Sequence, residues 1–352
     1  MNENALRAWL DRRALDHEFS GVALVWRQGS PVFSYAGGLA NRGHQIPVTE
    51  DTRFAVASIT KMATAAAALR LVDRGELELD GKLLQLLPVG QRPRALTPEH
   101  TLHHLLSHTS GLANYHDDDD ETWASFTACW DRIPSYHIRR PADMLPLFED
   151  LPAVSAPGEE FQYGDVNFIL VGLILEAVTS RPWAEVVAAE VFEPTHMSST
   201  GIDSLDADPP RLATGYLTSD EPYESWRSNI FGVPAAGMPD GGMITTAPDL
   251  ARLVDALAAQ RLLSPESTAA MISPQGPPST DVEQYGYGCE LTIEDGAVTI
   301  IGHGGSDPGV SAVVSHYLAD GTSIVVLCNQ DRGSWAVSQR LTAEFGLPDP
   351  RT

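Results

Sequence analysis

The fold and the chemistry of this chain both depend on one stretch, FAVASITKMATAAAALRLVDRG, residues 54–75. Its alanines and leucines predict a helix over 59–74, and Gly75 marks its end. Ser58 stands where this helix begins and Lys61 follows three residues later, so both side chains lie on one helical face. A serine hydroxyl becomes reactive when a neighbouring base takes its proton, and Lys61 can do so if burial lowers its pKa. Only two of the 23 basic residues are lysines, which draws attention to this one.

Strand patterns lie on both sides of this helix, towards the two ends of the chain. Residues 21–27 and 31–37 alternate apolar with small or polar positions around Gly29-Ser30, which predicts a β-hairpin. The C-terminal part repeats the signal, with strands expected at 285–293, 297–303, 310–318 and 323–328 and turns at Asp295-Gly296 and Asp320-Gly321. Terminal helices are expected at about 3–18 and 333–345. We therefore expect an α+β fold, a three-layer α/β/α sandwich whose antiparallel sheet is built from both terminal segments.

The middle of the chain is predicted to be mostly helical. Helices are expected at 99–107, 141–150, 166–179, 183–191 and 247–259, and surface loops at 115–140 and 203–235. This pattern predicts an inserted helical domain over 61–239. Residues 1–60 and 240–352 would form the sheet domain, with the active site between the two.

Two further motifs carry chemically useful groups. FQYGDVN, residues 161–167, precedes an apolar helix; Tyr163 can relay a proton there, and Asp165 can hold a lysine or simply cap the helix. GHGGS, residues 302–306, ends an apolar run, where glycines let a substrate lie against backbone N–H groups that stabilise an oxyanion. Each motif, Ser-x-x-Lys included, has an ordinary structural explanation when taken alone. Their joint occurrence in this order favours a catalytic site.

The totals exclude several classes of function. At 352 residues the chain can bury a large core, and it has no apolar stretch of about eighteen residues to span a membrane. The N-terminal residues lack a continuous hydrophobic segment, so we expect no signal peptide and a cytoplasmic location. A formal charge of −24 argues against nucleic acid and membranes as partners. The three cysteines share no CxxC spacing and are expected to be free thiols.

With these motifs in order, the chain resembles the penicillin-recognising serine hydrolases: class C β-lactamases, D-Ala-D-Ala carboxypeptidases and their esterase and D-aminopeptidase relatives. That superfamily is marked by Ser-x-x-Lys, then Tyr-x-Asn or Ser-x-Asn, then a Lys/His-x-Gly strand. The resemblance spans about residues 18–345 and includes HLLSHTSGL at 104–112 and GGMITT at 241–246. It implies a β-lactamase/transpeptidase-like fold and a serine hydrolase that works through an acyl-enzyme, with no metal or other cofactor.

The resemblance also implies roles for individual residues. Ser58 would form the acyl-enzyme, Lys61 would deprotonate it, and Tyr163 would protonate the leaving group and help to activate the deacylating water. The backbone N–H groups of Ser58 and Ser306 would form the oxyanion hole. The pocket would also be lined by Asp165, His303, Gly304 and Gly305.

Two departures from the superfamily's pattern bear on the substrate. Asp165 stands where asparagine is usual, and His303 stands where β-lactamases usually keep a lysine for the substrate carboxylate. Both changes disfavour an anionic substrate such as penicillin. We therefore expect a small ester, amide or peptide substrate, as for an esterase or a D-amino-acid peptidase or amidase. D-Ala-D-Ala carboxypeptidase or β-lactamase activity is the alternative.

Other interpretations stay open. His100, His103, His104 and His108 fall within nine residues, but no glutamate lies between them as in HExxH, so a metal site is disfavoured. The acidic run Asp117 to Asp120 is typical of a solvated loop. A catalytically inactive binding or assembly relative is a further alternative, against which the retained Ser58 and Lys61 argue. The acyl group, the leaving group and the oligomeric state are left open.

Overall fold

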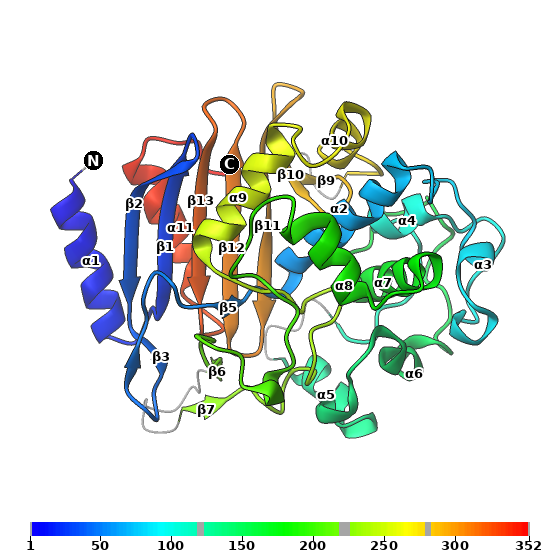
Figure 1. The fold of residues 1–352 in the computed structure, drawn as a ribbon, viewed down its shortest axis with the longest axis horizontal. Helices are drawn as coiled ribbons and strands as arrows, with labels where there is room; N and C mark the ends of the chain where they lie inside the picture. The colour runs from blue at the N-terminus through cyan, green and yellow to red at the C-terminus, as the bar shows by residue number, and fades with distance from the viewer. Residues whose placement is uncertain (1, 118–122, 218–225, 279–282, 351–352) are drawn as a thin grey trace.

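An antiparallel sheet forms the centre of the protein and draws its strands from both ends of the chain. The computed structural model describes residues 2–117, 123–217, 226–278 and 283–350. The sheet has seven strands in the order β2-β1-β13-β12-β11-β10-β9. The strands are β1 (Gly21–Arg27), β2 (Ser30–Gly37), β9 (Glu283–Tyr285), β10 (Glu290–Glu294), β11 (Ala297–Asp307), β12 (Val310–Tyr317) and β13 (Thr322–Cys328). Figure 1 shows β1 lying beside β13, which joins the N-terminal hairpin to the C-terminal strands.

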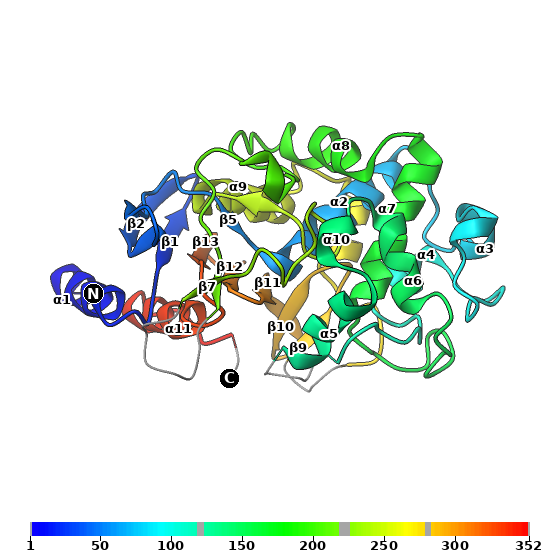
Figure 2. The same ribbon diagram turned by 90° about the horizontal axis from the view of Figure 1, so that it is seen from below.

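Helices cover both faces of this sheet, as Figure 2 shows. α1 (Glu3–Leu15) and α11 (Ser334–Glu344) lie on one face, and α9 (Ala247–Ala258) lies on the other. Successive strand residues point to opposite faces, so Val25 belongs to one core with Leu6 and Leu341, whereas Leu24 belongs to the other core with Leu250. These two cores confirm the α+β fold and the three-layer sandwich.

One stretch that was expected to be a single strand is two strands. The run 285–293 divides into β9 and β10 because the chain reverses at Gly286 to Cys289. Gly288 has a φ of +65°, and the Gly286 N–H donates to the Cys289 carbonyl at 2.8 Å. The Asp295-Gly296 turn is confirmed, with positive φ angles of 50° and 77° that match a tight hairpin.

The remaining helices come mainly from the middle of the chain. They are α2 (Thr60–Asp73), α3 (Leu83–Leu86), α4 (Leu102–Leu106), α5 (Ala124–Arg132), α6 (Leu145–Phe148), α7 (Asp165–Thr179), α8 (Trp183–Val187) and α10 (Pro265–Met271). The expectation of a loop over 115–140 is wrong in part, because α5 lies within it. Phe126, Cys129 and Trp130 are buried at positions i, i+3 and i+4 of α5, the spacing of an amphipathic helix. The domain limits 1–60, 61–239 and 240–352 stay a prediction.

Small strand pairs lie outside the main sheet, and one of them positions the start of the candidate site. β5 (Phe54–Ala55) pairs with β8 (Ile244–Thr245), and the Val56 N–H donates to the Met243 carbonyl at 3.1 Å. The chain then makes a 3₁₀ turn over Ala57–Ile59 before α2 begins. The other pairs are β3 (Leu39–Asn41) with β4 (Ile46–Pro47) and β6 (Tyr216–Leu217) with β7 (Arg227–Ser228).

The apolar helix α7 is a core element. Its residues are buried from Asp165 to Leu175, and it packs against α2 and α4. Within the described ranges, no single helix has the length and apolar composition to cross a membrane. α7 meets those criteria only together with Trp183–Phe192, across an 82° bend.

Candidate active site

Ser58 lies in the tight turn that leads into α2. Ala57 has a positive φ of 45°, and Thr60 Oγ1 donates to the Ala57 carbonyl at 2.7 Å while it accepts from the Met243 N–H at 2.9 Å. These bonds hold the turn against the β5–β8 pair. Lys61 Nζ lies 2.8 Å from Ser58 Oγ. The structure therefore brings the two predicted side chains together, as their spacing on one helical face indicated.

Lys61 is fully buried, and three oxygens surround its ammonium group. It donates to Ser58 Oγ, to Asp165 Oδ1 at 2.6 Å and to the Asp240 backbone carbonyl at 3.0 Å. Burial lowers the pKa of Lys61, but the charges of Asp165 and Asp240 outweigh burial and raise the pKa above its ordinary value. The condition that burial lowers this pKa is therefore not met in the resting protein. In the resting protein Lys61 is a protonated cation.

Asp165 is the partner of Lys61 and not a helix cap. α7 begins at Asp165 with Gly164 as its N-cap residue, and the Asp165 carboxylate accepts from Lys61 and from His116 Nε2, 2.9 Å from Oδ2. Burial raises the pKa of Asp165, but the charge of Lys61 and the hydrogen bond from His116 outweigh burial and hold the pKa below its ordinary value. Asp165 is thus an ionised carboxylate whose charge Lys61 matches.

His108 holds the loop on which Tyr163 lies. The His108 ring packs on the Tyr163 ring with centres 4.4 Å apart, and its Nδ1 accepts from the Gly164 N–H at 3.3 Å and from Asn167 Nδ2 at 3.1 Å. Burial lowers the pKa of His108 well below its ordinary value, so the ring is neutral. Lys61 Nζ lies 4.9 Å from the centre of the Tyr163 ring. His108 therefore positions Tyr163 beside the Ser58–Lys61 pair.

The other histidines of the cluster also make protein contacts. His100 Nε2 lies 3.0 Å from the Ser110 carbonyl, His103 Nδ1 lies 2.7 Å from the Tyr287 hydroxyl, and His104 Nδ1 accepts from the Thr101 N–H at 3.1 Å. In the part of the chain that the structure describes, no group of histidine, cysteine and acidic side chains is arranged to hold a metal ion. Of the acidic run, only Asp117 lies within the described residues.

The glycines of GHGGS make room for the protein itself. A Cβ on Gly305 would lie 2.1 Å from the Val56 carbonyl oxygen, and a Cβ on Gly304 would lie 2.8 Å from the Trp335 ring. Protein packing is thus one reason for these glycines, and their role in letting a substrate lie against the backbone stays a prediction. β11 packs directly on the backbone that precedes Ser58, which brings the end of β11, with Ser306, to the Ser58 turn.

His303 lines the pocket, but its ring nitrogens already have protein partners. Nδ1 donates to the Gly304 carbonyl at 2.5 Å, and Nε2 accepts from the Tyr285 hydroxyl at 2.9 Å. Burial lowers the pKa of His303 although the Glu290 carboxylate, 3.3 Å from Nδ1, opposes this. His303 is therefore a neutral residue that provides no cation for a substrate carboxylate.

The predicted site residues meet in one pocket of about 380 Å³. Its lining contains Ser58, Tyr163, Asp165, His303, Gly304, Gly305 and Ser306, and Lys61 lies behind Ser58. The lining also contains five acidic residues, which are Asp117, Asp165, Asp240, Glu290 and Asp307. Among the described residues that line it there is no arginine or lysine. The pocket thus has a strongly acidic lining.

Sequence reasoning missed three of these acids. Asp240 directly precedes GGMITT, Asp307 directly follows Ser306, and Glu290 begins β10. For Asp240 and Asp307 the available signal was their position directly beside a motif, whereas Glu290 has no such signal. We call Ser58, Lys61, Tyr163 and Asp165 the catalytic wall of the pocket, and Asp240 and Asp307 the acidic wall.

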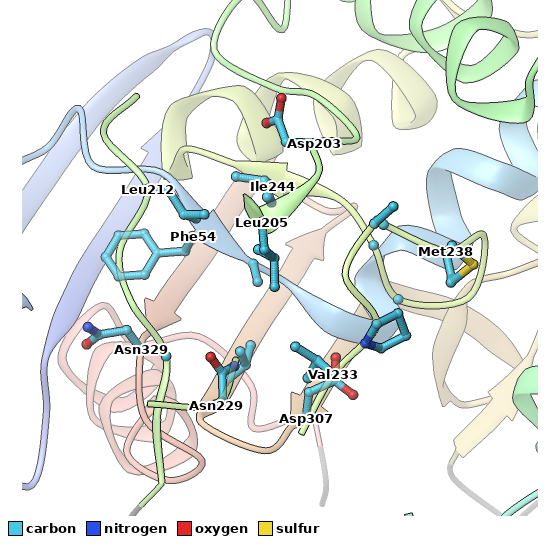
Figure 3. A pocket seen from close by; sticks show the side chains of 18 of the residues that line it. Phe54, Asp203, Leu205, Leu212, Asn229, Val233, Met238, Ile244, Asp307 and Asn329 are labelled. Carbon is cyan, nitrogen blue, oxygen red and sulfur yellow. The ribbon is translucent and has the colours of Figure 1, made fainter. Parts of the chain in front are cut away.

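The acidic wall separates the pocket from a small apolar cavity. This cavity, of about 90 Å³, shares Phe126, Asp240, Gly241 and Asp307 with the catalytic pocket. Figure 3 shows Asp307 beside Val233 at the edge of this cavity, which Leu205 also lines. Burial, together with the Asp165 charge, raises the pKa of Asp240 to about 7. The same two causes raise the pKa of Asp307 well above its ordinary value.

Comparison with known proteins decides the family. The family model described as Beta-lactamase matches residues 6–346. The chain belongs to the Beta-lactamase family. It is 26% identical over 326 residues to penicillin-binding protein 4* of Bacillus subtilis (strain 168), which covers 90% of this chain and 69% of the relative. It is also 32% identical over 270 residues to esterase EstB of Burkholderia gladioli. That alignment covers 70% of this chain and 68% of the relative.

A solved structure supports the same placement of this Beta-lactamase family protein. The crystal structure of a penicillin-binding protein from Bacillus halodurans is 35% identical and superposes with a TM-score of 0.87 over 98% of this chain and 100% of that one. The β-lactamase/transpeptidase-like fold is thereby confirmed. The chain is a serine hydrolase of this family.

Proposed function

We propose that this serine hydrolase cleaves small neutral or cationic esters or amides through an acyl-enzyme on Ser58. One observation carries the proposal. The hydrogen-bonded row of Ser58, Lys61 and Asp165 opens on a pocket with five acidic residues in its lining. The row supplies a nucleophile with a base, and the acidic residues select the charge of the substrate.

Lys61 becomes a base by passing a proton to Asp165. Nζ and Oδ1 are 2.6 Å apart, so a proton can move between them and leave a neutral amine beside a carboxylic acid. A substrate that displaces water from the pocket favours this transfer, because a buried neutral pair avoids the desolvation cost of two charges. The Lys61 amine then accepts the Ser58 proton as Oγ attacks the carbonyl carbon.

The remaining steps use groups on the same wall and on β11. The backbone N–H groups of Ser58 and Ser306 stabilise the oxyanion of the tetrahedral intermediate. As the intermediate collapses, Tyr163 gives its proton to the leaving group. Tyr163 recovers a proton from the water that attacks the acyl-enzyme. Lys61 returns a proton to Ser58 Oγ as the acyl bond breaks, and Asp165 returns its proton to Lys61, so that all three groups are regenerated.

Charge disfavours substrates with a carboxylate. At an effective dielectric near 20, a unit charge about 4 Å away contributes about 4 kcal/mol, and solvent reduces this figure at an open pocket. His303 is neutral, and Glu290 places a carboxylate next to it, 3.3 Å from Nδ1. Penicillins and D-Ala-D-Ala peptides, which carry an anion, are therefore poorer substrates than neutral esters.

A substrate panel tests the proposal. Purified protein is assayed with short p-nitrophenyl esters, D-amino-acid amides, D-Ala-D-Ala peptides and nitrocefin. We expect kcat/KM for the best ester or amide to exceed that for nitrocefin by at least about a hundredfold, the ratio that 2.7 kcal/mol of charge repulsion produces. Comparable turnover of nitrocefin would contradict the charge argument and favour a β-lactamase. The absence of turnover on all substrates would favour an inactive binding relative.

A further inference from the structure

The acidic wall holds two carboxyl groups whose pKa values are raised by burial and by the lack of a cation of their own, so a bound cation would favour their ionised form. Lys61 and His116 are the basic groups that face Asp240 and Asp307, and both donate to Asp165. Among the described residues, Lys61 is the one buried lysine of the site, and its ion pair is with Asp165. No ion pair among these residues joins a basic residue to Asp240 or Asp307. Two carboxyl groups therefore remain without a cation.

Asp240 also has an unsatisfied atom that points to a missing ligand. Its Oδ2 accepts from the Tyr115 hydroxyl at 3.2 Å, but its Oδ1 is buried and lacks any hydrogen-bond partner. The residue is 7% exposed. A buried carboxyl oxygen without a donor is costly, and proteins rarely keep one without a reason. The atom has almost no exposed surface, but its residue lines the catalytic pocket, so a substrate donor can reach it when the Asp240 side chain turns toward the pocket.

The second carboxyl group is next to the expected oxyanion hole. Asp307 follows Ser306 on β11, and a Cβ on Gly241 would lie 3.7 Å from Asp307 Oδ2 and 3.8 Å from the Ala57 carbonyl carbon. Asp307 thus adjoins the turn that carries Ser58. Ser58 and Asp307 line the same pocket.

We propose that Asp240 and Asp307 bind the ammonium group of the substrate, so that the preferred substrates carry an unblocked amino group on the acyl side of the scissile bond. The proposal rests on the proposed function and adds the residues that choose the acyl group. An ammonium group has three N–H donors, enough to satisfy Asp240 Oδ1 and Asp307 together. The net charge of −24 also attracts cationic substrates over long range.

Matched substrates test the subsite. D- and L-alanine p-nitroanilide are compared with their N-acetyl derivatives at pH 7, where most of an α-amino group of pKa about 7.7–8.0 is protonated. We expect kcat/KM for the better enantiomer to be at least tenfold higher with the unblocked amine. An N-acetyl derivative that reacts equally well or better would overturn the proposal.

Isosteric variants connect the preference to the two residues. Asp240→Asn and Asp307→Asn should each lower the ratio of amine to N-acetyl turnover at least tenfold, mainly through KM. The ratio cancels any effect on Ser58 chemistry that both substrates share. Asp80→Asn, which removes an exposed acid in the segment before α3, is the matched control and should leave the ratio unchanged. Unchanged ratios in both pocket variants would overturn the assignment.

Three further measurements keep the test decisive. Calorimetric titration of wild-type protein with alaninamide and N-acetylalaninamide needs no turnover and no folded variant, and alaninamide should bind at least tenfold more tightly. Equal affinities would reject the subsite even if the proposed function fails. If the protein hydrolyses p-nitrophenyl acetate but shows no preference between the alanine p-nitroanilides and their N-acetyl derivatives, the subsite is rejected and the proposed function stands. Loss of activity in excess EDTA, restored by Ca²⁺, would show that the carboxylates hold a metal and would overturn the proposal.

Discussion

The two walls of the pocket treat charge in opposite ways. On the catalytic wall the Lys61 cation meets the Asp165 anion at 2.6 Å, and His116 supplies a second donor to the same carboxylate. On the acidic wall Asp240 and Asp307 face an apolar cavity on one side, and burial raises the pKa of both carboxyl groups. On the catalytic wall the Lys61 and Asp165 charges are paired within the protein, whereas on the acidic wall Asp240 Oδ1 has no hydrogen-bond donor. This difference suggests that the catalytic wall sets the reaction and the acidic wall sets the substrate.

The largest effect should come from removing the nucleophile on the catalytic wall. Ser58→Ala should lower kcat/KM for p-nitrophenyl acetate by about 10⁴-fold or more, the scale seen when a hydrolase loses its nucleophile. The variant should keep the circular dichroism spectrum of wild type, because Ser58 lies in a pocket and not in the core. Substantial turnover in this variant would place the chemistry on another residue.

The next effect concerns the base on the same wall. Lys61→Arg should be nearly as damaging as Lys61→Ala, with losses of roughly 10²–10⁴-fold, because arginine keeps the charge opposite Asp165 but does not give up its proton. Comparison of kcat for the two variants checks this. Near wild-type kcat in Lys61→Arg would mean that the lysine acts only through its charge.

A smaller effect should follow from moving the catalytic wall away from β11. Gly305→Ala places a Cβ 2.1 Å from the Val56 carbonyl oxygen, so the backbone beside Ser58 must shift. We expect kcat/KM to fall by about 10²-fold and the free energy of unfolding to drop by about 1–3 kcal/mol in urea titrations. Gly90→Ala, where the added Cβ has open space, is the control and should do neither. Full activity in Gly305→Ala would show that this close packing does not position Ser58.

The smallest effect is a change in pH dependence. Lys61 acts as a base only when neutral, and the Asp165 charge raises the pKa of Lys61. Asp165→Asn removes that charge and also the group that takes the Lys61 proton, so Lys61 then becomes neutral only by losing its proton to solvent. An acid limb that reports the lowered Lys61 pKa should therefore appear in the kcat/KM profile. Asp165→Glu keeps the charge and should leave the limb near its wild-type position. An acid limb in Asp165→Asn at the same pH as in wild type would show that Asp165 does not control the protonation of Lys61.

Local patterns were enough to predict much of the fold and the catalytic wall. The hairpin over 21–37, the antiparallel C-terminal strands and helix α2 each follow from periodicity and turn residues in continuous segments. Ser58 and Lys61 are three residues apart, so their contact depends only on helix geometry. Tyr163 and GHGGS could be placed in the same pocket through the family pattern, and the structure brings them there.

The acidic wall could not be predicted in the same way, because it depends on distant segments. Asp240 and Asp307 come from separate parts of the chain, and only packing places both on the pocket. The direction of the Lys61 pKa also escaped prediction, since it depends on how Asp165 and Asp240 balance burial. α5 was missed because its three buried residues lie among polar neighbours over a short span.

Site-specific labelling of Ser58 tests the central claim most directly. Wild-type protein is treated with a fluorophosphonate, and the adduct is located by peptide mass spectrometry, with Ser58→Ala as the control. We predict one adduct per chain, on Ser58, and none in the variant. An adduct on another residue, or no adduct on wild-type protein that is correctly folded, would contradict Ser58 as the activated nucleophile of this hydrolase.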